Sequence, residues 1–157
     1  MAAKTVAPDK PVPAFSLPAT GGGTWSLKDA AGSTLVLYFY PRDNTPGCTQ
    51  EGKDFAASAA AFRKAGVVVL GISADSLESH ETFKAKMQFP FELLADTDQK
   101  ACKLFDVIKE KSMYGKKFLG IERSTFLIDG KGVLRKEWRK VKVPGHVADV
   151  LAAAKAL

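Results

Sequence analysis

Residues 34–48 read TLVLYFYPRDNTPGC, an apolar run that breaks into a turn-rich loop and ends on a cysteine. The run from Thr34 to Tyr40 lacks polar alternation and is bounded by Gly32-Ser33 and Pro41, a pattern typical of a strand buried on both faces. A helical pattern follows the loop, so Cys48 is expected in the first turn of a helix. The partial positive charge and unpaired N–H groups of a helix amino end favour a thiolate over a thiol, which predicts a reactive nucleophile at Cys48.

Strand and helix patterns alternate after this loop, and the strand patterns are short apolar runs. Such an alternation predicts helices packed on a sheet whose strands are largely parallel. The expected elements are a helix from Cys48 to Gly66, a strand over 67–73, a helix carrying Phe83 and Met87, a strand over 91–95, and a helix burying Ala101, Leu104 and Phe105.

The two ends of the chain have a different pattern. Apolar runs at 124–128 and 133–138 flank the turn Asp129-Gly130-Lys131-Gly132 and predict an antiparallel pair, and a last helix is expected from Pro144. Near the start, 15–27 predicts a small hairpin through three glycines. The sequence therefore predicts one α/β domain over residues 1–157, with a thioredoxin-like fold: a central mixed β-sheet flanked by helices, and an N-terminal β-hairpin.

Length and composition limit the function. The chain has 157 residues and is 46% hydrophobic, enough for one domain with a full core, and no segment reaches the roughly 18 apolar residues of a membrane span. The first residues lack the apolar run of a signal peptide, so we expect a soluble, cytoplasmic protein. Two cysteines form neither a disulfide framework nor a zinc site, and His80 and His146 are isolated in the sequence, so we expect no metal and no cofactor.

The formal net charge of +6, concentrated in the C-terminal half, raises the question of nucleic-acid binding. Acidic residues interrupt the basic ones at Glu110, Glu122, Asp129 and Glu137. The segment 130–143 has the pattern of a strand with one solvated face rather than of a groove that follows phosphates. We therefore expect no nucleic-acid partner.

Ionisation of the sulfur alone does not make a fast enzyme. An ordinary cysteine is about 3% thiolate at pH 7, so full ionisation gains roughly 30-fold, or about 2 kcal/mol. Further acceleration needs donors held around the reacting atoms. The candidates are the Thr45 hydroxyl, the Cys48 backbone N–H and a guanidinium, for which we nominate Arg123 at the start of the run 124–128; Gly47 would allow a close backbone approach.

These residues match a known motif. Pro41, Thr45 and Cys48 fit P-x-x-x-[TS]-x-x-C, the active-site motif of the peroxiredoxins, and 40–49 together with Glu51 resembles the bacterioferritin comigratory protein (peroxiredoxin Q) subgroup. The resemblance continues at 95–96, 105–107, 114–115, 120–129 and 145–146, in family order, and so covers nearly the whole chain.

The resemblance implies a thiol-dependent peroxidase that reduces hydrogen peroxide and organic hydroperoxides. Cys48 would attack the peroxide and become a sulfenic acid, Thr45 and Arg123 would hold sulfur and peroxide in line, and Pro41 would shield the sulfenate. Glu51 is a supporting residue that would accept a hydrogen bond, although a carboxylate in a first helical turn also suits the helix dipole. The subgroup favours a monomer or weak dimer.

The sequence departs from the subgroup in its second cysteine. The position on the same helix where many members carry a resolving cysteine is Lys53, and the next helix, around 79–87, also has none. We expect a one-cysteine cycle in which an external thiol, such as thioredoxin, glutaredoxin or glutathione, reduces Cys48. The alternative is a Cys48–Cys102 disulfide, but Cys102 lies among buried positions where a cysteine is commonly a core residue.

A second alternative is a thioredoxin-like binding domain with an inert Cys48. The sequence argues against it, since an inert thiol has no need of Thr45 on the preceding loop. A disulfide oxidoreductase would want a second cysteine close by, as in C-x-x-C, which this loop does not provide.

Overall fold

The computed structural model describes residues 6–157. Its centre is a five-stranded mixed sheet in the order β5-β4-β3-β8-β9. The parallel strands are β3 (Thr34–Phe39), β4 (Val67–Ser73) and β5 (Glu92–Ala95), and the antiparallel ones are β8 (Ser124–Ile128) and β9 (Leu134–Trp138). The apolar run that opens the sequence is the central strand, and all but its first residue are buried, as predicted.

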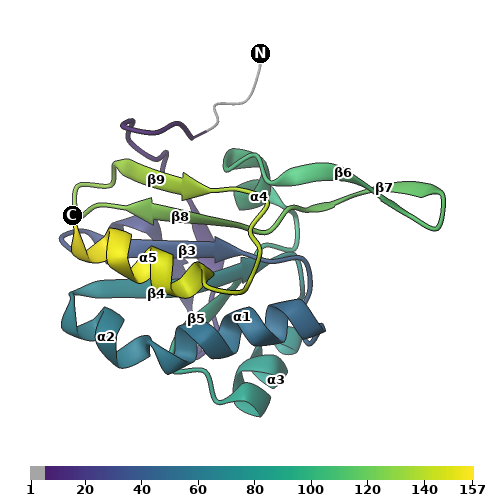
Figure 1. Ribbon diagram of the computed structural model, residues 1–157, viewed down its shortest axis with the longest axis horizontal. Coiled ribbons are helices and arrows are strands. Elements are labelled where there is room, and N and C mark those ends of the chain that lie inside the picture. The colour runs from purple at the N-terminus through teal and green to yellow at the C-terminus, as the bar shows by residue number, and fades with distance from the viewer. Residues whose placement is uncertain (1–5) are drawn as a thin grey trace.

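Helices cover both faces of the sheet (Figure 1). One face packs against α1 (Pro46–Ala57), α2 (Ala59–Lys64) and α5 (His146–Lys155), with α3 (Leu77–Met87) beside them. The other face packs against α4 (Lys100–Leu104) and the N-terminal hairpin of β1 (Ser16–Pro18) and β2 (Thr24–Ser26), which leads into a short 3₁₀ helix, η1 (Leu27–Ala30). The thioredoxin-like arrangement and the N-terminal hairpin are therefore confirmed.

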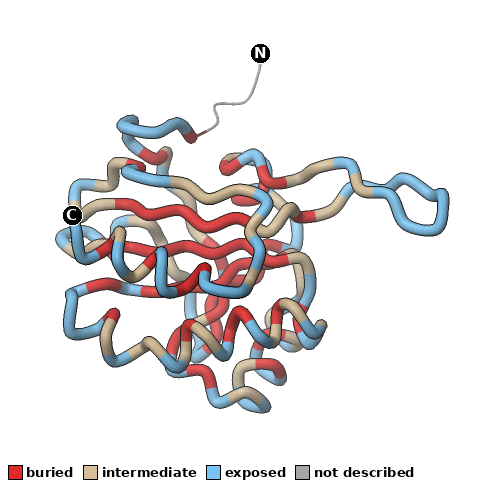
Figure 2. Tube along the Cα trace, in the orientation of Figure 1, coloured by how far each residue is buried: buried red, intermediate tan, exposed pale blue. Residues whose placement is uncertain are grey.

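Alternate residues of β3 divide the core in two. Leu35, Leu37 and Phe39 face the α4 side, whereas Val36 and Tyr38 face the α1 side. Period-two alternation places successive side chains on opposite faces of a strand, so each face has its own apolar cluster. The buried segments of the chain are concentrated in these central strands and on the inner sides of the helices (Figure 2).

Two expected boundaries are wrong. The helix after Cys48 does not run unbroken to Gly66, because Ser58 has a φ of −98° and a ψ of 5°, outside the helical region, and separates α1 from α2. The last helix starts at His146 rather than Pro144, because Gly145 takes a left-handed conformation with a φ of 78° just before it.

The sequence analysis also missed a hairpin. It consists of β6 (Ile108–Met113) and β7 (Lys116–Ile121), which pair antiparallel and extend away from the body of the molecule (Figure 1). Its strands are lysine-rich and mostly exposed, so they lack the apolar run used to find the other strands. Among residues 6–157, no helix is both long and apolar enough to cross a membrane.

Candidate active site

Cys48 lies in the first turn of α1, as predicted. Thr45 is the N-cap residue and Pro46 the first helical residue, a position that suits proline because its missing N–H would have no helical partner. The backbone N–H of Thr49 donates to the Thr45 carbonyl at 2.8 Å and closes this first turn. The Cys48 side chain faces inward and the residue is only 2% exposed.

Sheet register brings Arg123 to the cysteine. Ser124 pairs with Phe39 in the β3–β8 ladder, so Arg123 lies beside the end of β3 from which the loop to Cys48 departs. The Arg123 Nη2 donates to the Cys48 sulfur at 3.4 Å. A guanidinium there supplies a fixed positive charge and a hydrogen-bond donor to a sulfur anion.

Glu51 holds the same guanidinium from the other side. It lies three residues after Cys48 on α1, a spacing that places both side chains on one helix face. Its Oε1 accepts from Arg123 Nη1 at 2.7 Å, whereas its buried Oε2 has no hydrogen-bond partner. Burial raises the pKa of Glu51 to about 7, against the opposing effect of Arg123. Burial alone would lower the pKa of Arg123, but Glu51 and then Cys48 raise it above its ordinary value.

Gly47 provides the space for this contact. A β-carbon on Gly47 would lie 3.0 Å from Arg123 Nη2, the atom that donates to sulfur. The expected close approach at Gly47 is thus a guanidinium approaching the helix backbone. A side chain at this position would press on the donor itself.

Thr45 and Pro41 occupy the loop before the helix. The Thr45 hydroxyl donates its proton to the Arg42 carbonyl at 2.9 Å, so its oxygen lone pairs, rather than its proton, are available to a ligand. Pro41 is half-buried directly after Tyr40 at the end of the central strand. No hydrogen bond joins Thr45 to Cys48 within the described residues, whereas Arg123 contacts both Cys48 and Glu51 and lies against Gly47.

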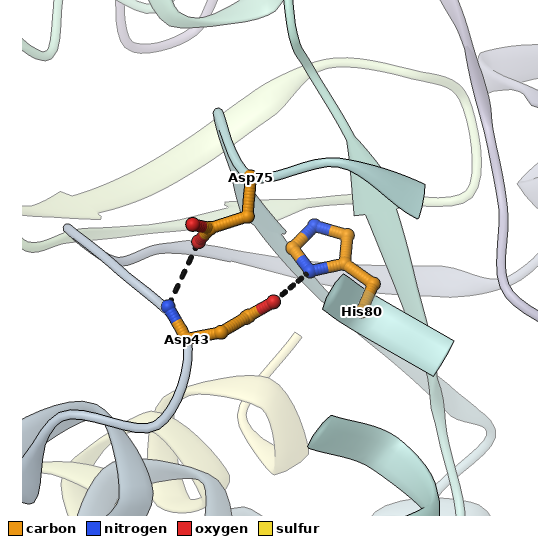
Figure 3. Close-up of side chains that lie close together, drawn as sticks. All are labelled: Asp43, Asp75 and His80. Atoms are coloured by element: carbon orange, nitrogen blue, oxygen red, sulfur yellow. Dashed lines mark hydrogen bonds and ion pairs between the residues drawn. The ribbon is translucent and has the colours of Figure 1, made fainter. Parts of the chain in front are cut away.

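A buried polar network anchors the loop (Figure 3). Asp43 accepts from the Tyr40 hydroxyl at 2.6 Å and from the Ser79 hydroxyl at 2.8 Å, and it lies 2.7 Å from the His80 Nδ1. Its backbone N–H donates to Asp75 at 2.8 Å. The loop that precedes Cys48 is therefore tied to α3 and to the end of β4.

The network contains a buried pair, Asp43 and His80. The His80 Nδ1 lies 2.7 Å from Asp43 Oδ2 and its Nε2 lies 2.9 Å from the Leu94 carbonyl, so an oxygen atom faces each ring nitrogen. Burial would raise the pKa of Asp43, but hydrogen bonds from His80 and Tyr40 lower it below its ordinary value. Sequence reasoning missed this pair, because the signal, an aspartate in the loop and a histidine 37 residues later, is too sparse to recognise.

Asp43, Asp75 and His80 are also three potential metal ligands whose donor atoms lie within 4.8 Å of one another. Existing hydrogen bonds already engage both Asp43 oxygens and both His80 nitrogens. One Asp75 oxygen accepts from the Ser73 hydroxyl as well as from Asp43. The donor set fits a self-satisfied hydrogen-bond network better than a cation site.

Cys102 is remote from this site in the fold. It lies on α4, is fully buried, and packs in the cluster with Leu35 and Phe39, across the sheet from the cluster that contains Cys48. Burial, reinforced by Asp96, raises the pKa of the Cys102 thiol well above its ordinary value. Its backbone N–H donates to the Asp96 carboxylate at 2.7 Å, which also fixes the start of the helix.

Comparison with known proteins gives the family of the chain. Residues 8–137 match the model of the AhpC/TSA family. The chain is 55% identical over 148 residues to "Peroxiredoxin Bcp" of Xanthomonas campestris pv. campestris, covering 93% of this chain and 92% of that protein. It is 50% identical to "Peroxiredoxin Bcp" of Bacillus subtilis, covering 91% of each.

A solved structure also superposes closely. It is the structure of a Xanthomonas campestris bacterioferritin comigratory protein that has alkyl peroxide reduction activity. The TM-score is 0.86 at 54% identity, over 90% of each chain. The present chain therefore belongs to the AhpC/TSA family, within the bacterioferritin comigratory protein (peroxiredoxin Q) subgroup of the peroxiredoxins.

Proposed function

We propose that this peroxiredoxin reduces hydrogen peroxide and organic hydroperoxides with Cys48 alone, and that an external thiol completes the cycle. The observation that carries the site assignment is the Arg123 guanidinium, which lies 3.4 Å from the Cys48 sulfur and is held there by buried Glu51. Membership of a peroxidase family argues against the alternative that the chain is a binding domain with an inert cysteine.

The site fits attack by a thiolate on a peroxide. The Cys48 thiolate forms a bond to the near peroxide oxygen, the O–O bond breaks, and the distal oxygen leaves as alkoxide or hydroxide and takes a proton to become an alcohol or water. Cys48 is oxidised to a sulfenic acid and the peroxide is reduced by two electrons. Arg123 offsets the negative charge as it moves from sulfur to oxygen.

Thr45 and Glu51 suit the two ends of the substrate. The Thr45 proton is already given to the Arg42 carbonyl, so its oxygen can accept a hydrogen bond from the peroxide O–H. The unpaired Glu51 Oε2 is the one buried side-chain polar atom of the described residues that lacks a partner, which supports a further donor at this site during the reaction. Pro41, at the loop start, would limit access of bulk water to the sulfenate.

The placement of Cys102 favours the one-cysteine cycle. A disulfide needs Cα atoms within about 7 Å, whereas Cys48 and Cys102 belong to clusters on opposite faces of the sheet. A bond between them would require one helix to leave the core. The relevant partner of the Cys48 sulfenic acid is then a thiol from another molecule.

One experiment separates the two cycles. The reduced protein receives one equivalent of peroxide with a sulfenate-trapping reagent present, and its intact mass is measured without reductant. We expect one trap adduct at Cys48 in the wild type and in Cys102→Ala. A loss of two hydrogens within the monomer, absent from Cys102→Ala, would overturn the one-cysteine cycle. Failure of wild type to consume peroxide faster than Cys48→Ser would overturn the assignment of Cys48.

A further inference from the structure

The hairpin of β6 and β7, which we name the arm (residues 108–121), has an unusual surface. Six large hydrophobic residues are exposed within the described residues, and four belong to the arm. They are Met113, Tyr114, Phe118 and Leu119, and Tyr114 at the turn is 96% exposed. Exposed apolar groups gathered on a projecting element indicate a surface that another molecule covers.

The two faces of the arm differ in composition. Residues paired directly across an antiparallel ladder share a face, and the pairs Lys109–Gly120, Lys111–Phe118 and Met113–Lys116 occupy one of them. We call this face the platform; its side chains are Lys109, Lys111, Met113, Lys116 and Phe118. The opposite face bears Ile108 and buried Ile121 at its base, then exposed Leu119 and an ion pair of Glu110 and Lys117 farther out.

The platform adjoins the active site. The Lys111 side chain lies across Gly120, and its Cδ is 3.3 Å from where a β-carbon on Gly120 would stand. Arg123 follows Gly120 by three residues. Burial, and then the charge of Arg123, lower the pKa of Lys111, and Cys48 opposes this shift, so the Lys111 amine lies within electrostatic reach of the catalytic pair. Lys111 is thus the part of the platform that leads toward the catalytic pair, and a molecule that covers the platform extends from the arm toward Arg123.

Charge selects the kind of occupant. Lys109 is paired with Asp106 at 3.2 Å, but Lys111 and Lys116 have no acidic partner in the described part of the chain. Two platforms facing each other would bring unpaired lysines together, which argues against a second copy of this chain. Met113 and Tyr114 lie at the turn, but Phe118 and Leu119 lie farther along β7, so the exposed apolar surface is not confined to the tip, as insertion of the tip into a membrane would favour.

We propose that the platform docks the reductant of Cys48, and that this reductant is a thiol–disulfide carrier protein whose reactive cysteine pair is rimmed by apolar and acidic side chains. The inference rests on the proposed one-cysteine cycle, which requires an external thiol beside Cys48. Phe118 and Met113 supply the apolar contact, and Lys111 and Lys116 supply the complementary charge.

The chemistry requires such proximity. A thiolate of the carrier attacks the Cys48 sulfenic sulfur, an S–S bond forms, and the hydroxyl leaves as water after taking a proton. The second thiol of the carrier then attacks the sulfur of the carrier's first cysteine in this mixed disulfide and releases the Cys48 thiolate. Cys48 gains two electrons, and the carrier leaves as a disulfide.

Matched double variants test the docking face. Lys116→Glu with Phe118→Ser alters the platform, whereas Lys117→Glu with Leu119→Ser makes the same two changes on the opposite face of the same strand. The probe is a purified acidic thioredoxin, recycled by its reductase, with peroxide in excess. We expect the platform variant to raise the KM for thioredoxin at least about 10-fold, and the opposite-face variant to change it by less than about 2-fold.

Salt provides a second readout. The KM of the wild type should rise with ionic strength, since an attraction between unlike charges is screened, and this rise should weaken or reverse in the platform variant. Equal KM values for thioredoxin in the wild type and in the two double variants would overturn the proposal. Binding of the arm to anionic phospholipid vesicles, or a dimer lost in the platform variant, with no change in KM would also overturn it in favour of a membrane or a second copy.

Two measurements keep this failure apart from failure of the proposed function. Oxidation of Cys48 by peroxide is followed in a single turnover without any reductant, and turnover is followed with dithiothreitol, a small neutral thiol that needs no docking surface. A wild type that fails both contradicts the one-cysteine peroxidase itself. A wild type that passes both, with no difference between the two faces, contradicts only the docking.

Discussion

Substitution of Gly47 by alanine should separate activity from stability. Gly47 is the second residue of α1, and its added methyl group would stand 3.0 Å from Arg123 Nη2. Ordinary contact begins near 3.4 Å, so the guanidinium must retreat by a few tenths of an ångström or the helix turn must shift. The displaced atom is Nη2, which lies 3.4 Å from the Cys48 sulfur in the wild type, so its displacement alters this contact.

The expected loss of rate lies between two limits. If Nη2 moves about 0.5 Å farther from sulfur, the attraction between unit charges at an effective dielectric constant near 20 weakens by roughly 0.6 kcal/mol, or about 3-fold in rate. Complete loss of one preorganised donor costs about 100-fold to 1,000-fold. We expect a decrease between 3-fold and about 100-fold, because Glu51 still holds the guanidinium at 2.7 Å.

Stability should change in the opposite direction. Alanine is favoured over glycine within a helix by up to about 1 kcal/mol, so Gly47→Ala should fold at least as well as the wild type unless the shifted guanidinium offsets this gain. Gly52→Ala is the matched control, five residues later on α1, where the methyl group would collide with the Phe89 ring. That collision should cost about 1–3 kcal/mol of unfolding free energy.

The assay is the second-order rate constant for oxidation of Cys48 by hydrogen peroxide in a single turnover, measured by stopped-flow fluorescence, with urea unfolding of each variant. Gly47→Ala should lose rate and keep stability, whereas folded Gly52→Ala should lose stability and keep most of its rate. An unchanged rate constant in Gly47→Ala would refute the idea that Arg123 acts on sulfur from its observed position.

Three further outcomes are expected. Arg123→Met should slow oxidation of Cys48 by about 100-fold to 1,000-fold in a folded protein, and an unchanged stopped-flow rate constant would remove Arg123 from the site. His80→Asn should cost about 1–3 kcal/mol, because it removes the hydrogen bond between His80 Nδ1 and the buried Asp43 carboxylate. Hydrogen bonds from His80 and Tyr40 lower the pKa of Asp43 against the effect of burial, so this contribution is present above about pH 4 and is lost as the pH falls through the folded pKa. Urea unfolding of the variant should therefore show a shallower loss of stability in acid. Burial lowers the pKa of His146 from 6.5 to about 4, so the wild type should lose about 3 kcal/mol more than His146→Gln as the pH falls from 6.5 to 4. The raised pKa of Glu51 acts in the opposite direction but equally in both proteins, so the same pH dependence in the two would contradict this origin.

The sequence is most informative where one physical effect dominates. The strand through Tyr38 and the one over 67–73 follow from apolar runs alone, because only a buried strand tolerates such runs between turn residues. Cys48 at a helix amino end follows from local proline and glycine placement. Arg123 could be nominated because it adjoins a buried strand, although its 3.4 Å distance to sulfur depends on sheet register that no local pattern encodes.

Long-range polar contacts were beyond sequence reasoning. Asp43 and His80 are brought together by a crossover through β4, and a single aspartate in a loop is equally compatible with a solvated turn. The arm was missed because it has no apolar run. Its two strands pair with each other, and their side chains are mostly polar or exposed.

One shared cation couples the buried carboxyl group of the site to the cysteine. Arg123 faces two groups that can each be negative, the Glu51 carboxyl and the Cys48 sulfur. Burial raises the pKa of Glu51 to about 7, so near neutral pH this carboxyl readily holds a proton and leaves the guanidinium charge to the sulfur. Oxidation then removes the sulfur charge while the reacted atom stays 2% exposed. On the proposed one-cysteine cycle, recovery of Cys48 falls to a thiol from another molecule, because Cys102, the other cysteine of residues 6–157, packs on the opposite face of the sheet.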